Sequence, residues 1–88
     1  MYIAYMEKAN KNTTPDIVIQ LGERIKNTIV KNNLRQREVA HDAGLDVENL
    51  RKYIKGTQQM KISTLVRIAE ALNMTASQLI DGLPKQKD

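Results

Sequence analysis

The sequence predicts an all-α fold of five helices in a single small domain. In several segments the apolar residues recur every three or four positions, most clearly between residues 61 and 72, which is the spacing of one buried helix face. A second pattern, between residues 36 and 53, predicts two short helices joined by a tight turn. The length of 88 residues allows one domain, whose small core would stabilise the fold by about 5 kcal/mol at most.

The chain divides into an arm, a domain and a tail. Residues 1–13 lack helical periodicity, and we expect a flexible N-terminal arm there. The helical domain extends over residues 14–82, and residues 83–88 form a short polar tail. The apolar side chains of residues 2–6 leave open a second interpretation, in which they form a strand or arm that binds a partner.

The first helix is expected over about residues 14–32. The Thr14 side chain can cap its first turn, where Pro15 is tolerated and the Asp16 carboxylate complements the positive end of the helix dipole. At the other end, Asn32-Asn33 can provide the left-handed backbone conformation with which many helices end.

The second helix is expected from about Gln36 to Ala43. Val39 and Ala40 lie within one helical turn of Ala43, so these three side chains form one buried stripe. Gly44 then ends the helix, because a glycine permits the positive φ that a sharp exit requires.

The third helix follows over about residues 46–55. The Asp46 carboxylate can accept hydrogen bonds from the free backbone N–H groups of the first turn. Leu50, Tyr53 and Ile54 recur at helical spacing and give this helix an inward face.

Two further helices complete the domain. The fourth, over about residues 61–72, has the most regular apolar spacing in the chain. The fifth opens at Thr75, which forms the pattern of a capping box with Gln78, and it ends at Ile80.

Five residues at the centre of the chain stand at the spacing of a known motif: Gln36, Ala40, Gly44, Leu50 and Tyr53. In these positions the chain resembles the helix-turn-helix of the phage-repressor-like family, of the Cro or Xre type, and the resemblance extends over roughly residues 21–80. It implies a compact five-helix, repressor-like DNA-binding fold, in which the second and third helices form the helix-turn-helix.

In the family that this chain resembles, side chains near the start of the second motif helix reach base edges in the major groove. Val47, Glu48 and Lys52 match those positions. Val47 can contact a thymine methyl group, Glu48 can accept from a cytosine amino group, and Lys52 can donate to guanine. Alternatively, Glu48 and Lys52 form a surface ion pair worth only about 0.2–0.5 kcal/mol.

The resemblance also implies contacts to DNA phosphates. Gln36 matches a glutamine with which the family contacts the DNA backbone, and Arg35 stands where the family usually has a helix-capping serine or threonine. A cation at this position would favour phosphate attraction over helix stability. The expected phosphate contacts are Arg35, Gln36, Arg37, Arg51, Lys55 and Lys61.

A second departure from the family concerns the core. Many members pair an arginine in the first helix with a glutamate near the end of the recognition helix, and the matching residues here are Ile29 and Ile54. Replacing both partners avoids a stranded buried charge, and a well-packed apolar pair is often as stable as the ion pair.

Composition excludes several classes of function. The chain has no cysteine and one histidine, His41, so we expect no disulfide, metal site, cofactor or enzymatic activity. We expect no membrane span, signal peptide or small-molecule effector site, and therefore a cytoplasmic protein. The net charge of +4 favours a polyanionic partner, although it can also serve solubility alone.

We therefore expect sequence-specific binding of double-stranded DNA by a homodimeric transcriptional repressor with a palindromic operator. Two-fold pairing would place two recognition helices about 34–36 Å apart on one face of the DNA. Candidates for the dimer surface are Met74, Leu79, Ile80 and Leu83, and for Leu79 and Ile80 the alternative is that they cover the core. Two alternatives remain: an antitoxin or restriction-modification controller with the same fold, and a protein-interaction module that does not bind DNA.

Overall fold

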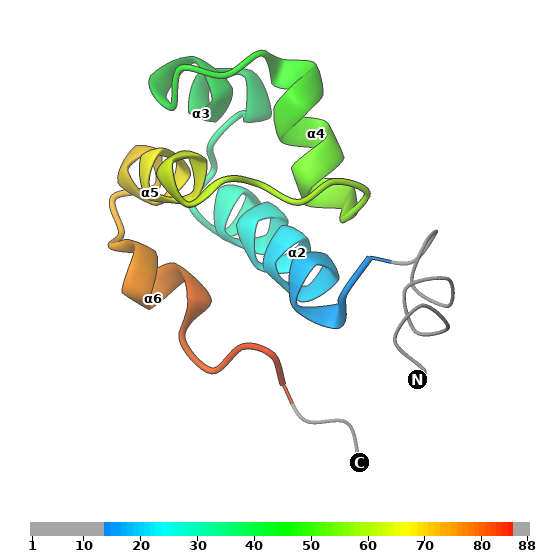
Figure 1. Cartoon of the computed structure of the whole chain (residues 1–88). Helices are drawn as coiled ribbons and strands as arrows, with labels where there is room; N and C mark the ends of the chain where they lie inside the picture. Colours follow the sequence, from blue (N-terminus) through cyan, green and yellow to red (C-terminus); the bar gives the residue numbers. More distant parts are fainter. Residues whose placement is uncertain (1–13, 86–88) are drawn as a thin grey trace, which may run out of the picture.

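The computed structural model describes residues 14–85, which form five helices and no strand (Figure 1). The expected arm, residues 1–13, and the last three residues of the tail lie outside the described part of the chain. The helices are α2 (Asp16–Lys31), α3 (Gln36–Asp42), α4 (Val47–Lys55), α5 (Ile62–Ala71) and α6 (Ala76–Ile80). The predicted fold class is confirmed, and each predicted helix is present within one or two residues of its expected ends.

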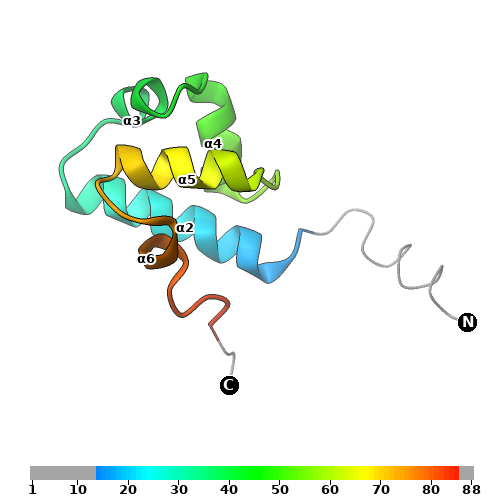
Figure 2. The ribbon, with the colours of Figure 1, turned by 60° about the vertical axis from the view of Figure 1, so that its left-hand side comes forward.

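The helices form a closed ring around one core. Helix α2 packs against α4 and α6, α3 packs against α4 and α5, and α5 packs against α6. As a result α3 and α4 lie together at one end of the molecule, away from α6 (Figures 1 and 2).

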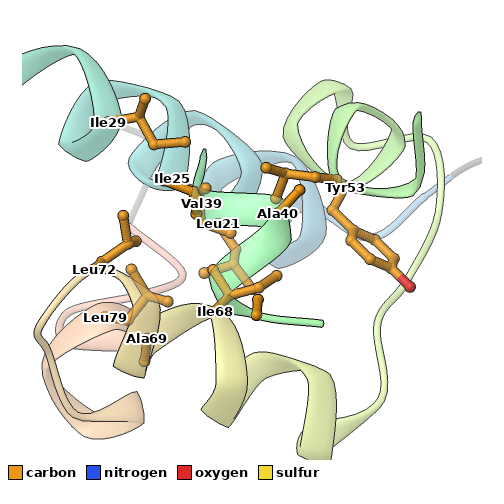
Figure 3. Close-up of a cluster of buried hydrophobic side chains, with 12 residues drawn as sticks. Leu21, Ile25, Ile29, Val39, Ala40, Tyr53, Ile68, Ala69, Leu72 and Leu79 are labelled. Carbon is orange, nitrogen blue, oxygen red and sulfur yellow. The ribbon is translucent and has the colours of Figure 1, made fainter. Parts of the chain in front are cut away.

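The core fills the centre of this ring (Figure 3). Ile25, Leu50, Ile68 and Leu79 are completely enclosed, so α2, α4, α5 and α6 each contribute one of them. The two isoleucines at the family's ion-pair positions also face the interior, since Ile29 is buried and Ile54 packs partly buried against the core. The remaining core residues are Leu21, Ile29, Val39, Ala40, Ala43, Tyr53, Ala69 and Leu72.

The helices start near the predicted residues, but only one of the three predicted side-chain caps forms its hydrogen bonds. At α6 the capping box is confirmed: the Gln78 backbone N–H donates to Thr75 Oγ1 at 3.0 Å, and the Thr75 N–H donates to Gln78 Oε1 at 2.9 Å. The predicted cap by Thr14 is wrong, because α2 starts later and Pro15 occupies its N-cap. Asp46 stands at the N-cap of α4, but its carboxylate accepts no cap hydrogen bond, so that part of the prediction is also wrong.

Four of the described helices end with the same backbone conformation. A residue with positive φ follows each of four helices within two positions, as Asn33 (57°) follows α2 and Gly44 (71°) follows α3. Gly56 follows α4 in the same way, and Asn73 follows α5. The next N–H then bonds back to the last turn of the helix, as in the bond from Leu45 N to Ala40 O at 2.8 Å. This satisfies carbonyl groups that a helix end otherwise leaves without donors. The left-handed exit predicted after α2 is therefore confirmed at Asn33.

The apolar residues near the C-terminus cover the core instead of forming an open face. Leu79 is fully buried, and Met74, Ile80 and Leu83 pack partly buried against the core cluster. The exposed apolar side chains lie elsewhere, and two of them stand one helical turn apart on α5: Ile62, which is 80% exposed, and Val66.

The backbones of α2 and α4 come close together at Gly22, in the middle of α2. A Cβ atom at this position would lie within 3.0 Å of the backbone carbonyl oxygens of Tyr53 and Ile54, near the end of α4. At Gly56, just after α4, a Cβ atom would lie 2.9 Å from the Cα atom of Ile19 in α2. Glycine at both positions thus allows the backbones of α2 and α4 to meet.

Replacing Gly22 with alanine tests this contact. Gly→Ala in an open helix position stabilises a protein by up to about 1 kcal/mol. Here we expect the opposite sign for Gly22→Ala, a loss of about 1–3 kcal/mol in the free energy of unfolding by urea, because the methyl group collides with backbone atoms. Lys26→Ala, at an exposed position of α2, is the control and should change stability by no more than about 0.5 kcal/mol. Equal stability of the two variants would contradict the close approach.

Candidate nucleic-acid interface

The link between α3 and α4 sets the direction of α4. It consists of residues 43–46, and its sharp bend depends on the positive φ of Gly44. Leu45 follows with its side chain partly buried against the core, which anchors the link from inside. Two short helices are thus held across a tight turn, as the sequence predicts.

Helix α4 has one buried and one exposed face. Leu50 and Tyr53 are buried, and the Tyr53 hydroxyl points away from the core cluster (Figure 3). Since successive residues of a helix turn by about 100°, the opposite face is centred on Glu48, Lys52 and Lys55. All three are exposed, so α4 presents a polar face to any partner.

The three predicted base-contacting residues lie in different environments. Val47 is the first residue of α4, and its side chain is half-buried against the core. Glu48 is exposed and accepts a hydrogen bond at 2.8 Å from Arg51 Nη1. Lys52 is also exposed, and its ammonium group has no partner in the part of the chain that the structure describes.

Glu48 pairs with Arg51, so the alternative of a surface ion pair between Glu48 and Lys52 is wrong. Arg51 lies one residue nearer than Lys52, and a spacing of three residues brings side chains together on a helix as readily as a spacing of four. The pair leaves Lys52 available for another partner.

Four of the six predicted phosphate-contacting residues come together. Arg35, Gln36 and Arg37 at the start of α3 line a shallow hollow with Arg51 from α4, and Glu38 completes its wall. Lys55 lies on the exposed face of α4, and Lys61 occupies the N-cap of α5; neither lines this hollow.

The start of α3 carries the predicted departure from a capped helix. Arg35 is the N-cap residue, and its guanidinium group has no oxygen that could accept from the first turn. Glu38 supplies the other half of a capping box, because its Oε1 atom accepts from the Arg35 backbone N–H at 3.3 Å. This role of Glu38 was missed in the sequence, although glutamate three residues after an N-cap is its usual signal.

One histidine, His41, and several acidic side chains lie within residues 14–85. No group of three or more His, Cys, Asp or Glu side chains there could hold a metal ion. His41 is 89% exposed on its side chain, with Nδ1 3.6 Å from Asp42 Oδ1. No described helix combines the length and the apolar character needed to cross a membrane.

Comparison with known proteins identifies this arrangement. A family model described as a helix-turn-helix domain matches residues 22–83. The chain belongs to this family. Within the helix-turn-helix family it is 30% identical over 61 residues to the SPbeta prophage-derived HTH-type transcriptional regulator YopO of Bacillus subtilis (strain 168), a match that covers 69% of this chain and 87% of YopO.

Solved helix-turn-helix structures share the fold. The restriction-modification controller protein C.AhdI from Aeromonas hydrophila matches with a TM-score of 0.68 and 21% identity, over 70% of this chain and 94% of C.AhdI. The clp gene regulator ClgR from Corynebacterium glutamicum matches with a TM-score of 0.72 and 16% identity, over 82% of this chain and 99% of ClgR. At these identities the likeness concerns the fold alone, and it confirms the predicted repressor-like fold. The predicted membership of the helix-turn-helix family is confirmed by the family model and by YopO.

The uncapped start of α3 gives a prediction about stability. Arg35→Ser introduces a hydroxyl that can accept from the first turn and complete a capping box with Glu38. We expect it to raise the free energy of unfolding by about 1 kcal/mol, measured in urea. Arg37→Ser removes the same charge from a helical position without adding a cap, and we expect it to lower stability slightly. If Arg35→Ser were no more stable than Arg37→Ser, the missing cap would have no energetic weight.

Proposed function

We propose that this protein binds double-stranded DNA sequence-specifically and regulates transcription, with α4 in the major groove. The observation that carries the proposal is the exposed side of α4. It carries Lys52 and Lys55, and on the same helix Arg51 lines a hollow together with Arg35 and Arg37 from the start of α3. This juxtaposition suits a ligand that carries base edges and phosphates side by side. Membership of the helix-turn-helix family supports it.

The first part of the proposal concerns the bases. Lys52 is the strongest candidate, because its exposed ammonium group is free to donate to guanine O6 and N7. Glu48 would accept from a cytosine amino group, and the exposed part of Val47 would contact a thymine methyl group. Each well-formed contact discriminates against the wrong base by about 1–3 kcal/mol.

The second part concerns the phosphates. Arg35, Gln36 and Arg37 would bind one stretch of DNA backbone from the start of α3, with Arg51 on the other side of the hollow. Lys55 would bind phosphates from α4, and Lys61 from the start of α5. These contacts would supply affinity and fix the register of α4 without reading sequence.

The third part is a homodimer on a palindromic operator, which represses by occluding a promoter in the cytoplasm. One nine-residue helix reads too few base pairs for useful selectivity, whereas a symmetric dimer doubles the site. Ile62 and Val66 support this, because they give α5 an exposed apolar face suited to pairing with a second copy.

Two other functions compete with this proposal. The first is a controller or an antitoxin that uses the same DNA-binding surface, and the fold likeness to C.AhdI, a restriction-modification controller, is compatible with the controller. The exposed apolar face of α5 also fits a protein-interaction module without DNA binding. The dependence of binding on salt separates the interaction module from the DNA-binding proteins. DNA affinity falls steeply as the salt concentration rises, because counterions are released on binding, whereas the affinity of an apolar protein contact does not.

Selection of bound sites from random duplexes tests the proposed function. We expect the wild type to enrich an inverted repeat with half-sites about one helical turn apart. Lys52→Ala should lose the preference at one position of each half-site, by about 1–3 kcal/mol in the free energy of binding measured by fluorescence anisotropy.

Lys55→Ala is the matched control, because it removes an exposed lysine from the same helix face. It should weaken binding to all sequences alike and reduce the dependence on salt by about one unit of slope. If the wild type enriched no sequence even at low salt, the DNA-binding proposal would be wrong. A direct repeat or a single half-site would contradict the symmetric dimer alone.

A further inference from the structure

Glu48 and Arg51 form an ion pair on α4, and its significance for base specificity rests on the proposed function. Glu48 Oε2 accepts from Arg51 Nη1 at 2.8 Å, and both side chains are partly exposed, Glu48 to 66% and Arg51 to 44%. Glu48 stands in the first turn of α4, on the exposed face that it shares with Lys52 and Lys55. Its carboxylate is thus both accessible and held at one oxygen.

The second carboxylate oxygen is the one available to a ligand. Within residues 14–85, Glu48 Oε1 accepts no hydrogen bond. An ionised carboxylate accepts through both oxygens and donates through neither. Two amino donors face the major groove, those of cytosine and adenine, and the adenine amino group has the N7 acceptor beside it, which would repel a carboxylate. The cytosine amino group is therefore the better match for Glu48.

The position of Arg51 explains how a carboxylate can occupy such a surface. Arg51 lies about 60° around the helix from Glu48, on the side that faces the start of α3, where it lines the hollow with Arg35 and Arg37. Arg51 therefore both pairs with the Glu48 carboxylate and lines the hollow proposed for phosphates. A carboxylate next to phosphates is repelled, and a charge-assisted pair with Arg51 offsets that repulsion.

We propose that Arg51 is a positioning residue that holds Glu48 as an acceptor for cytosine, so that the two side chains act as one unit of base recognition. Arg51 then contributes to specificity through Glu48, in addition to lining the hollow proposed for phosphates. The proposed target is a site with a G·C pair whose cytosine amino group faces Glu48 in each half-site.

Base preference, measured separately from affinity, tests this unit. We expect the wild type to prefer cytosine at one half-site position, by about 10-fold in the dissociation constant over the other bases. Glu48→Gln should shift the preference at that position toward adenine, which a glutamine amide matches. Arg51→Gln should flatten the same preference, although residue 51 makes no base contact of its own in the proposal.

Lys55→Gln is the control for the lost charge of Arg51→Gln. Both variants remove one exposed cation from α4, and both should reduce the salt slope or the affinity to a similar small extent. Only Arg51→Gln should change the base preference. Thermal unfolding of each variant verifies that these exposed substitutions leave the fold intact.

Several results would overturn the inference. Arg51→Gln that weakens all sequences alike and keeps the cytosine preference would make Arg51 a phosphate ligand only. Complete loss of binding by folded Arg51→Gln would lead to the same conclusion. Specific DNA binding without a cytosine preference that depends on Glu48 would also contradict the inference, whereas the absence of any enriched sequence in the wild type would contradict the proposed function itself.

Discussion

The backbone contact between α2 and the end of α4 is the constraint on which the rest of the structure depends. Gly22 lets the two helices approach until any side chain at that position would collide with the carbonyl groups of Tyr53 and Ile54. The other end of α4 is fixed by the bend at Gly44. Because both ends of α4 are held in this way, its buried face closes the core and its opposite face is directed outward.

The exposed surface around α3 and α4 combines cations with acids, and two of these carboxylates already have partners. Glu38 accepts from the Arg35 backbone N–H, and Glu48 accepts from the Arg51 guanidinium group. Such acids repel a polyanion less than free carboxylates would, since their charge is partly compensated within the surface. The mixed charge of this face is therefore compatible with the proposed nucleic-acid partner.

Much of the fold was predictable because local signals agreed. Helical spacing of apolar residues, the asparagine at position 33, Gly44 and the Thr75–Gln78 capping box each act within a few residues. Contacts between distant segments were not predictable, because local sequence patterns do not specify them. No such pattern indicates that Gly22 in α2 faces the α4 backbone. Likewise, no local pattern decides whether Met74 and Ile80 cover the core or bind a partner. At the site, residue types and positions followed from the motif. The choice of Arg51 over Lys52 as the partner of Glu48 did not, because both spacings are allowed on a helix.

The central claim is that the exposed face of α4, held by α2, is the surface that reads DNA. Its most direct test is an NMR titration of the ¹⁵N-labelled protein with a duplex that carries the selected site. The account predicts that the largest shifts of backbone amides fall on residues 36–37 and 47–55, the start of α3 and the length of α4. If the largest shifts fell instead on the Ile62–Val66 face of α5, with α4 unchanged, the claim would be contradicted.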